Sequence, residues 1–208
     1  MAELRVARTE LILGGQRSGK SRRAEALAQR WLTQSPLHRA VLIATAEPWD
    51  EEMRTRIARH QRDRVERVPG MRTVEEPMAL GDALAQHSDP KTLIVVDCLT
   101  LWLTNLLMPH EPVKEQPGNA ENSLEYESNK ALAQDLPAQA AMLLIAIKKA
   151  AGPVVLVGNE IGLGVIPLGR ETRAFVDALG RLNQDVAAVC ERVTFMAAGL
   201  PLVLKGRS

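Results

Sequence analysis

One eight-residue glycine-rich stretch near the start of the chain constrains its fold more than any other feature. Residues 14–21 read GGQRSGKS and match the pattern G-x-x-x-x-G-K-[ST] at every fixed position. The apolar run 10–13 precedes the match, and a helix-like segment follows over 22–32. In a strand, loop and helix of this kind, backbone N–H groups point at phosphate oxygens and the helix N-terminus adds partial positive charge. A glycine turn without a ligand is the alternative, and the two flanking elements disfavour it. The stretch therefore predicts a bound nucleoside triphosphate.

Each residue of this loop is predicted to contact the nucleotide. Lys20 supplies a mobile positive charge for the outer phosphates, which makes it a candidate catalytic residue. The Ser21 hydroxyl is placed for a magnesium ion. The predicted contacts in the loop are Gly14, Gly15, Gln16, Arg17, Ser18, Gly19, Lys20 and Ser21.

Length and composition narrow the class of protein. The 208 residues fit a single α/β domain over 1–208. A formal net charge of +1 and 3% aromatic residues give no reason to expect nucleic acid as a partner. Cys98 and Cys190 form no C-x-x-C pair, so neither a disulfide framework nor a zinc site is indicated and we expect a cytoplasmic location. No apolar run approaches the length of a membrane span, so we expect no membrane anchor.

Apolar, β-branched runs alternate with helix-like segments along most of the chain. Such runs are typical of parallel strands that are covered by helices on both faces. We therefore predict a three-layer α/β fold like that of the phosphate-loop NTPases, with a mostly parallel central sheet. The runs are 11–13, 40–43, 92–96 and 153–157, and the helices are predicted at 19–32, 50–65, 77–87, 100–108, 128–151 and 170–190.

Two other segments depart from this alternation. Residues 192–197 and 202–205 are short strands about a Gly199-Leu200-Pro201 turn, which predicts an antiparallel hairpin at one edge of the sheet. Residues 109–129 are rich in proline, charge and amides, which predicts an exposed, mobile loop. A tolerated insertion explains this loop more simply than a substrate lid does.

An acidic residue ends the strand predicted at 92–96. In a protein with a phosphate-binding loop, a carboxylate at that point commonly holds magnesium, directly or through water. Asp97 is therefore the candidate metal-side residue. The alternative is a helix cap or a turn at the end of the strand.

The helix predicted at 50–65 carries a histidine and many arginines. Met53, Ile57 and His60 fall on one face, and by periodicity alone a histidine there is more often packed than catalytic. The arginines are most simply a solvated face, although their density beside a triphosphate-binding loop favours some phosphate contacts. A glycine-rich stretch at 157–167 follows the last parallel strand and carries Glu160, and by itself it is most simply a connector.

Eight blocks along the chain form a pattern that is more specific than the loop alone. They are LGGQRSGKS (13–21), IATA (43–46), DEEM (50–53), RI with H (56–60), VDCLT (96–100), TNLL (104–107), NEIG (159–162) and GRLNQ (180–184). Together they resemble the bifunctional adenosylcobinamide kinase / adenosylcobinamide-phosphate guanylyltransferase family over nearly the whole chain.

The resemblance implies a homotrimeric enzyme that catalyses two reactions. It first phosphorylates the aminopropanol hydroxyl of adenosylcobinamide with ATP or GTP, and it then transfers GMP from GTP to adenosylcobinamide phosphate. The resemblance implies that His60 is the guanylyl carrier, which reverses its interpretation as a packed residue. It also implies that Ser21 and Asp97 hold Mg²⁺. The further implied nucleotide contacts are Thr45, Ala46, Glu47, Gln61, Arg62, Asp63, Arg64, Glu75 and Asp97.

Some alternatives stay open at this point. The stretch past His60 is longer than in the family's compact form, so Glu76 is an alternative to Glu75. One rival function is a small-molecule kinase without guanylyl transfer. Another is a non-catalytic GTP-binding regulatory module, although the N-K-x-D motif of guanine-specific switches is absent from the sequence.

Overall fold

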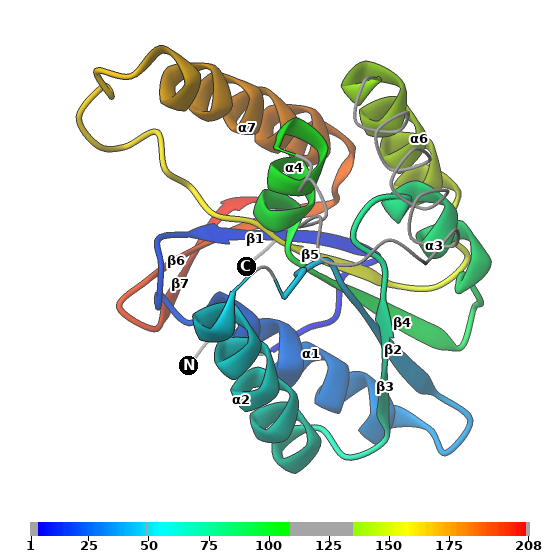
Figure 1. Cartoon of the computed structure of the whole chain (residues 1–208). Helices are drawn as coiled ribbons and strands as arrows, with labels where there is room; N and C mark the ends of the chain where they lie inside the picture. Colours follow the sequence, from blue (N-terminus) through cyan, green and yellow to red (C-terminus); the bar gives the residue numbers. More distant parts are fainter. Residues whose placement is uncertain (1–3, 49, 109–134, 207–208) are drawn as a thin grey trace, which may run out of the picture.

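The computed structural model describes residues 4–48, 50–108 and 135–206, and these residues form one seven-stranded sheet. The strand order is β3-β2-β4-β5-β1-β6-β7 (Figure 1). All neighbouring strands are parallel except β6 and β7, which form an antiparallel hairpin. The predicted parallel sheet with an edge hairpin is therefore confirmed. The strands are β1 (Thr9–Gly14), β2 (Arg39–Ala44), β3 (Met71–Glu75), β4 (Thr92–Asp97), β5 (Val154–Val157), β6 (Arg192–Ala197) and β7 (Leu200–Lys205).

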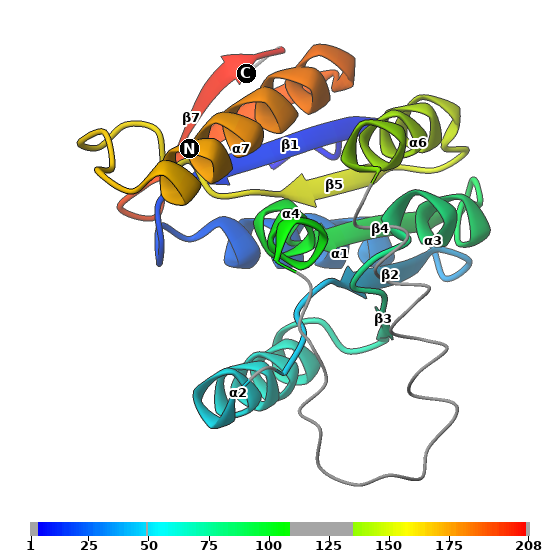
Figure 2. The same ribbon diagram turned by 45° about the horizontal axis from the view of Figure 1, so that its top comes forward.

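Helices lie on both sides of the sheet and complete three layers (Figures 1 and 2). On one side lie α1 (Lys20–Gln34) and α2 (Glu51–Arg67). The other side carries α3 (Leu80–Gln86), α4 (Leu99–Leu107), α6 (Leu136–Lys149) and α7 (Arg170–Val189). None of the helices in the described ranges is long and apolar enough to cross a bilayer.

The central strands are apolar because both of their faces are buried. In β1, Leu11 and Leu13 pack into the core beneath α3, α4, α6 and α7, whereas Ile12 packs into the core beneath α1. Trp102 of α4 is fully buried in the first core, and its indole Nε1–H donates to the Met78 carbonyl oxygen at 2.7 Å. A strand buried on both sides shows a continuous apolar run rather than alternation.

Two details differ from the sequence-based expectations. The strand β3 (Met71–Glu75) was not predicted, because it is an edge strand with mostly polar and exposed residues. Leu200 and Pro201 belong to β7 rather than to the hairpin turn; proline is tolerated in an edge strand, where its missing N–H breaks no ladder. The loop predicted at 109–129, and the start of the helix predicted at 128–151, lie outside the described residues.

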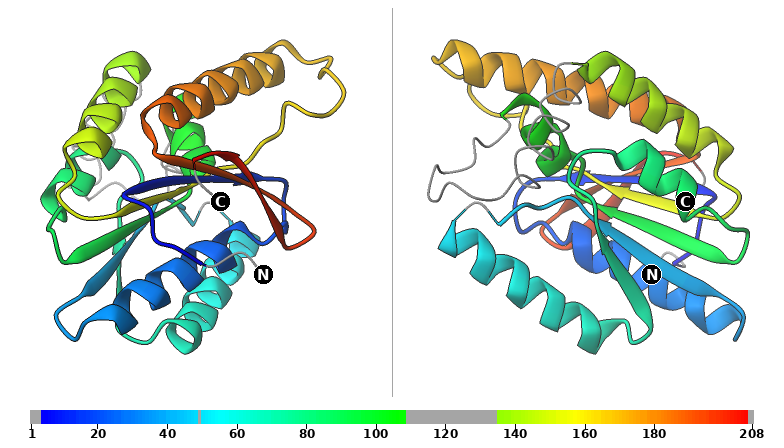
Figure 3. Two further views of the ribbon diagram at one scale, coloured as in Figure 1. Left: turned by 180° about the vertical axis from the view of Figure 1, so that it is seen from behind. Right: turned by 45° about the vertical axis from the view of Figure 1, so that its right-hand side comes forward.

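The strand order brings distant segments to one edge of the sheet. Strand β5 lies between β1 and β4, and its last residue, Val157, is in register with both Ile12 and Asp97. Figure 3 shows the same sheet from two further directions. Ligands of open α/β sheets bind at such a carboxyl edge.

Candidate functional site

A groove of about 1710 Å³ runs along this edge of the sheet. It is lined by the phosphate loop over residues 16–21, by Asp97 at the end of β4 and by Asn159 after β5. Helix α2 contributes His60, and the turn of the β6–β7 hairpin contributes Gly199. Five segments that are far apart in the sequence therefore share one cavity.

The phosphate loop leaves the start of α1 open to the groove. Helix α1 begins at Lys20, and its N-cap, Gly19, has a left-handed backbone with φ of 102°. Within the described ranges, no side chain caps this first turn. Its N–H groups can therefore bind phosphate oxygens, and the helix dipole favours the negative charge. Lys20 is mostly buried, and its ammonium lies over the loop, donating to the Gly15 carbonyl oxygen at 2.6 Å.

Gly14 has to be glycine because a strand and a side chain crowd it. Its φ is 150°, and an added Cβ would run into the Met196 carbonyl oxygen and would lie 2.7 Å from Ser18 Oγ. Ser18 Oγ is buried and, in the part of the chain that the structure describes, has no hydrogen-bond partner. A buried hydroxyl without a protein partner inside a phosphate loop is suited to a phosphate oxygen.

Thr45 ties the end of β2 to the residue after Asp97. Its Oγ1 donates to the Cys98 carbonyl oxygen at 2.7 Å and accepts from the Cys98 N–H at 2.9 Å. Its own N–H donates to the Asp97 carbonyl oxygen at 3.2 Å. Thr45 is fully buried. Its side chain thus holds the backbone that carries Asp97, and it does not line the groove.

Helix α2 carries the histidine into the groove. The Asp50 carboxylate caps the helix by accepting from the Met53 N–H at 2.6 Å, and acidic residues follow in the first turn. His60 is half-buried and lines the groove together with Met53 and Ile57, the two residues predicted to share its face. The phosphate loop and His60 therefore face the same cavity.

The far end of α2 is fastened to α1. Arg67 forms ion pairs with Glu25 of α1 and with Asp63, each at 3.1 Å. The hydrogen bond that Arg67 donates to the Glu25 carboxylate, together with the negative charge of Glu25, raises the pKa of Arg67. Because Glu25 is almost fully buried, the pair fixes the position of α2 beside the phosphate-loop helix.

One arginine of α2 is not part of a solvated face. Arg54, Arg59 and Arg62 are exposed, as predicted, but Arg64 is buried and lines the groove. Its NH1 donates to Thr73 Oγ1 at 3.2 Å. Arg64 was taken with the others as a surface residue because periodicity does not show that β3 packs against this part of the helix. A buried guanidinium in this position favours an anionic ligand.

The structure places Glu75 and Glu76 in different environments. Glu75 lines the groove and accepts a hydrogen bond from Gln61 Nε2 at 3.3 Å. The Glu76 carboxylate instead accepts from the N–H groups of Met78 (2.9 Å) and Ala79 (2.7 Å) just before α3. Glu75 is therefore the glutamate of this pair that faces the cavity.

Most of the predicted nucleotide contacts line the groove, and some do not. Those that do are Gln16, Arg17, Ser18, Gly19, Lys20, Ser21, Ala46, Gln61, Asp63, Arg64, Glu75 and Asp97, with His60 beside them. Those that do not are Gly14, Gly15, Thr45, Glu47 and Arg62.

Asn159 is a groove residue that was not among the predicted site residues. The stretch after β5 was interpreted as a connector, yet Asn159 lines the cavity with Lys20 and Asp97. Its position directly after a predicted buried strand is a sequence signal for a place at the carboxyl edge of the sheet. The sequence does not show, however, that this strand lies between β1 and β4, because strand order is not a local property.

The donor set of the groove suits magnesium. Ser21 and Asp97 both line the cavity and offer the oxygen ligands that this ion prefers. The described ranges contain no cluster of three or more His, Cys, Asp or Glu side chains that could hold a metal. Magnesium commonly takes one or two protein ligands and completes its shell with water and substrate phosphates, so the two residues fit the ion.

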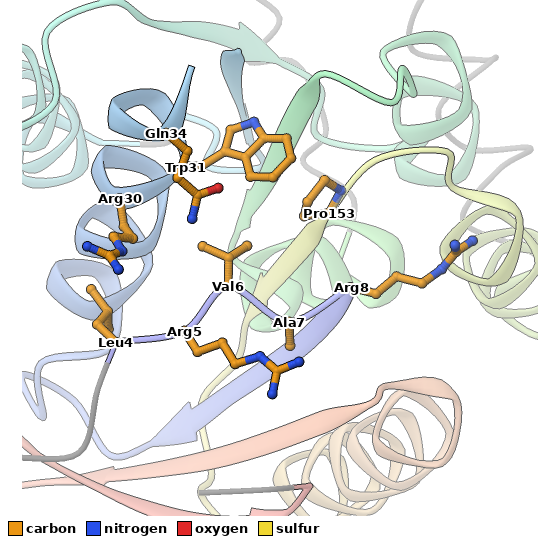
Figure 4. Close-up of a pocket in the computed structure, with 9 residues that line it drawn as sticks. All are labelled: Leu4, Arg5, Val6, Ala7, Arg8, Arg30, Trp31, Gln34 and Pro153. Atoms are coloured by element: carbon orange, nitrogen blue, oxygen red, sulfur yellow. The ribbon is translucent and has the colours of Figure 1, made fainter.

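A second, smaller hollow of about 310 Å³ lies among the residues before β1 and the later part of α1. Figure 4 shows that the guanidinium groups of Arg5, Arg8 and Arg30 point in different directions around it. Neither the phosphate loop nor any of the strand-end residues described above lines this hollow. The larger groove is therefore the candidate active site.

The fold and the groove define a nucleotide-binding α/β protein of the phosphate-loop class. A family model described as "Cobinamide kinase / cobinamide phosphate guanyltransferase" matches residues 10–204. The chain belongs to this family.

Relatives match over nearly their whole length. The bifunctional adenosylcobalamin biosynthesis protein CobP of Pseudomonas aeruginosa is 44% identical over 197 residues, which cover 95% of this chain and 97% of the relative. The bifunctional adenosylcobalamin biosynthesis protein CobU of Escherichia coli is 33% identical over 195 residues, covering 94% and 98%. A protein of the same name from Salmonella typhimurium is also 33% identical over 195 residues. The chain is thus a bifunctional kinase and guanylyltransferase of cobalamin biosynthesis.

Proposed function

We propose that the groove serves both reactions and that His60 carries the guanylyl group in the second, from GTP to adenosylcobinamide phosphate. Adenosylcobinamide is phosphorylated with ATP or GTP, and GMP then passes from GTP through His60 to adenosylcobinamide phosphate, giving adenosylcobinamide-GDP and pyrophosphate. The observation that carries this proposal is the placement of His60 on α2 in the same cavity as the phosphate loop. Triphosphate and nucleophile can meet there without movement of a second domain.

The guanylyl transfer balances as two displacements at the α-phosphorus. In the first, an imidazole nitrogen of His60 bonds to the α-phosphorus, the bond to the bridging oxygen breaks, and pyrophosphate leaves. In the second, a phosphate oxygen of adenosylcobinamide phosphate bonds to the same phosphorus and the phosphorus–nitrogen bond breaks. The attacking nitrogen is the one that carries no proton, so the other ring nitrogen keeps its proton through both steps and the neutral imidazole is regenerated in the second.

The groove supplies positive charge where the triphosphate is cleaved. Lys20 and the open N-terminus of α1 serve the outer phosphates, and the buried Arg64 adds a fixed cation near His60. Ser21 and Asp97 would hold Mg²⁺, which neutralises charge on the leaving group when it is bound. Gln61, Asp63 and Glu75 also line the cavity and are proposed as contacts to the rest of the nucleotide.

The proposal is tested by the covalent intermediate. The protein is incubated with GTP and Mg²⁺, and intact mass spectrometry is used to detect one added GMP that is labile in acid and stable in alkali. His60→Ala should abolish the adduct, whereas His87→Ala, a half-buried histidine at the end of α3, should retain it. An adduct that survives His60→Ala assigns the carrier to another residue.

Two further readouts separate the rival functions. Phosphorylation of adenosylcobinamide with ATP should continue in His60→Ala, because that step needs no guanylyl carrier. Phosphorylation without any adduct in the native protein would reduce the function to a kinase. Absence of both reactions in the native protein, with GTP binding intact, would indicate a non-catalytic GTP-binding module.

The same proposal includes a homotrimer in the cytoplasm. The loop before α7 projects beyond the sheet (Figure 2) and exposes a run of apolar side chains, with Val165 and Leu168 at 96% and 97% exposure. Strand β7 exposes Leu200, Leu202 and Leu204. Exposed apolar groups of this extent support subunit contacts, and light scattering coupled to chromatography tests the trimer. Binding of nucleic acid is still not expected.

A further inference from the structure

Asn159 stands between the two parts of the groove that bind phosphate and metal. It lies two residues beyond Val157, the last residue of β5, which is flanked by Ile12 of β1 and by Asp97 of β4. One of these neighbouring strands leads into the phosphate loop, and the other ends at the candidate magnesium ligand. Asn159 lines the groove together with residues of the phosphate loop and Asp97.

The backbone around Asn159 is held from both sides. Its N–H donates to Thr100 Oγ1 at 2.8 Å, and its carbonyl oxygen accepts from Asn183 Nδ2 at 3.1 Å. Thr100 on α4 and Asn183 on α7 are both buried. The next residue, Glu160, donates its N–H to the Gly14 carbonyl oxygen at 3.2 Å. The residue after Asn159 is thus fixed to the strand end that begins the phosphate loop.

The carboxamide of Asn159 contrasts with its backbone. Both backbone polar groups are hydrogen-bonded, but among the residues that the structure describes none forms a hydrogen bond with the carboxamide. The residue is half-buried and lines the groove. A neutral amide in that position can donate to an anion without adding charge, because its NH₂ group carries two donors.

We propose that the Asn159 carboxamide donates a hydrogen bond to the γ-phosphate during the kinase step, which makes it a catalytic residue for one of the two activities. This inference rests on the proposed function. In that step the aminopropanol hydroxyl oxygen bonds to the γ-phosphorus, and the bond between this phosphorus and the β,γ-bridging oxygen breaks. Nucleoside diphosphate leaves, and the hydroxyl proton passes to water. Asn159 transfers no proton.

The physical reason is the charge on the transferred group. Phosphoryl transfer spreads negative charge over the equatorial oxygens of the γ-phosphate, and catalysis depends on positioned donors that need no reorganisation. A donor whose backbone is held by hydrogen bonds on both sides meets this requirement. In guanylyl transfer the bonds to the γ-phosphorus do not change, so the same donor matters much less there.

The test compares two substitutions of Asn159 in both reactions. Asn159→Ala removes the donor, and kcat for adenosylcobinamide phosphorylation should fall by about 10²- to 10³-fold. Asn159→Asp keeps the shape but faces the phosphate with a carboxylate, so its kcat should be lower than that of the alanine variant. Formation of the GMP adduct on His60 should stay within about 3-fold of the native rate in Asn159→Ala. Gln184→Ala removes an exposed carboxamide on α7 and should change neither reaction.

The outcomes separate this inference from the proposed function. Native kcat in Asn159→Asp, or an equal loss of phosphorylation and adduct formation in Asn159→Ala, would overturn the role of the carboxamide. Absence of phosphorylation in the native protein would instead overturn the proposed kinase activity. An equal fall in affinity for GTP and GDP in Asn159→Ala would also contradict a contact to the γ-phosphate.

Discussion

The backbone N–H of Gly199 donates a hydrogen bond to the carbonyl oxygen of Ser18, with nitrogen and oxygen 3.0 Å apart. Gly199 lies in the turn of the β6–β7 hairpin, whereas Ser18 is in the phosphate loop. An ideal Cβ on Gly19 would also approach Gly199 Cα at 3.3 Å. The edge hairpin therefore supports the loop that binds phosphate, although the two are about 180 residues apart in the chain.

Substitution of Gly199 by alanine is expected to weaken both stability and nucleotide binding. Its φ is 79°, and no neighbouring atom lies within 4 Å of an added Cβ, so the penalty comes from the left-handed backbone alone. We expect the free energy of unfolding to fall by about 1 kcal/mol and the Kd for GTP to rise. Urea denaturation and calorimetric titration measure the two effects. Gly180→Ala, within α7 and also with open space around it, should instead leave stability unchanged or raise it.

Removal of the Thr45 hydroxyl is expected to destabilise the protein through Cys98. In Thr45→Val the buried Cys98 N–H loses its acceptor, and such a loss costs about 1–3 kcal/mol in the free energy of unfolding. Thr45→Ser keeps the hydroxyl and should restore most of the stability. Native stability with weakened GTP binding in Thr45→Val would contradict this and would return Thr45 to the nucleotide contacts.

Alkaline pH is expected to destabilise the protein through its two thiols. Burial, with a smaller contribution from Asp97, raises the pKa of Cys98 to about 11, and burial raises that of Cys190 to about 12. Both values lie above the 9.0 of a free thiol, so the folded state binds more protons than the unfolded state above that pH. The free energy of unfolding should therefore fall as the pH rises from about 9 towards 11.

Chemical denaturation across this pH range measures the effect. The double variant Cys98→Ala with Cys190→Ala should show a shallower fall than the native protein. An unchanged slope in the double variant would assign the alkaline loss to other groups.

The elements that the sequence predicted are those with local signals. The phosphate loop depends on eight consecutive residues, and α2 depends on apolar spacing and on acids and arginines at its two ends. The central strands were found because both of their faces are buried, which leaves a continuous apolar run. By contrast, β3 lies at an edge, where Arg72, Thr73 and Glu75 are exposed and no such run is required.

The features of the candidate site likewise divide into those with a local sequence signal and those without one. By itself the sequence determined a glycine-rich loop of the triphosphate-binding pattern and an acidic strand end at Asp97, and through its family resemblance it predicted a role for His60. Only the tertiary structure decided that Thr45 is held by Cys98, that Arg64 is buried, and that Asn159 lies between the loop and Asp97. These relations depend on strand order and on helix packing. They are contacts between residues far apart in the chain, and no local pattern of side chains encodes them.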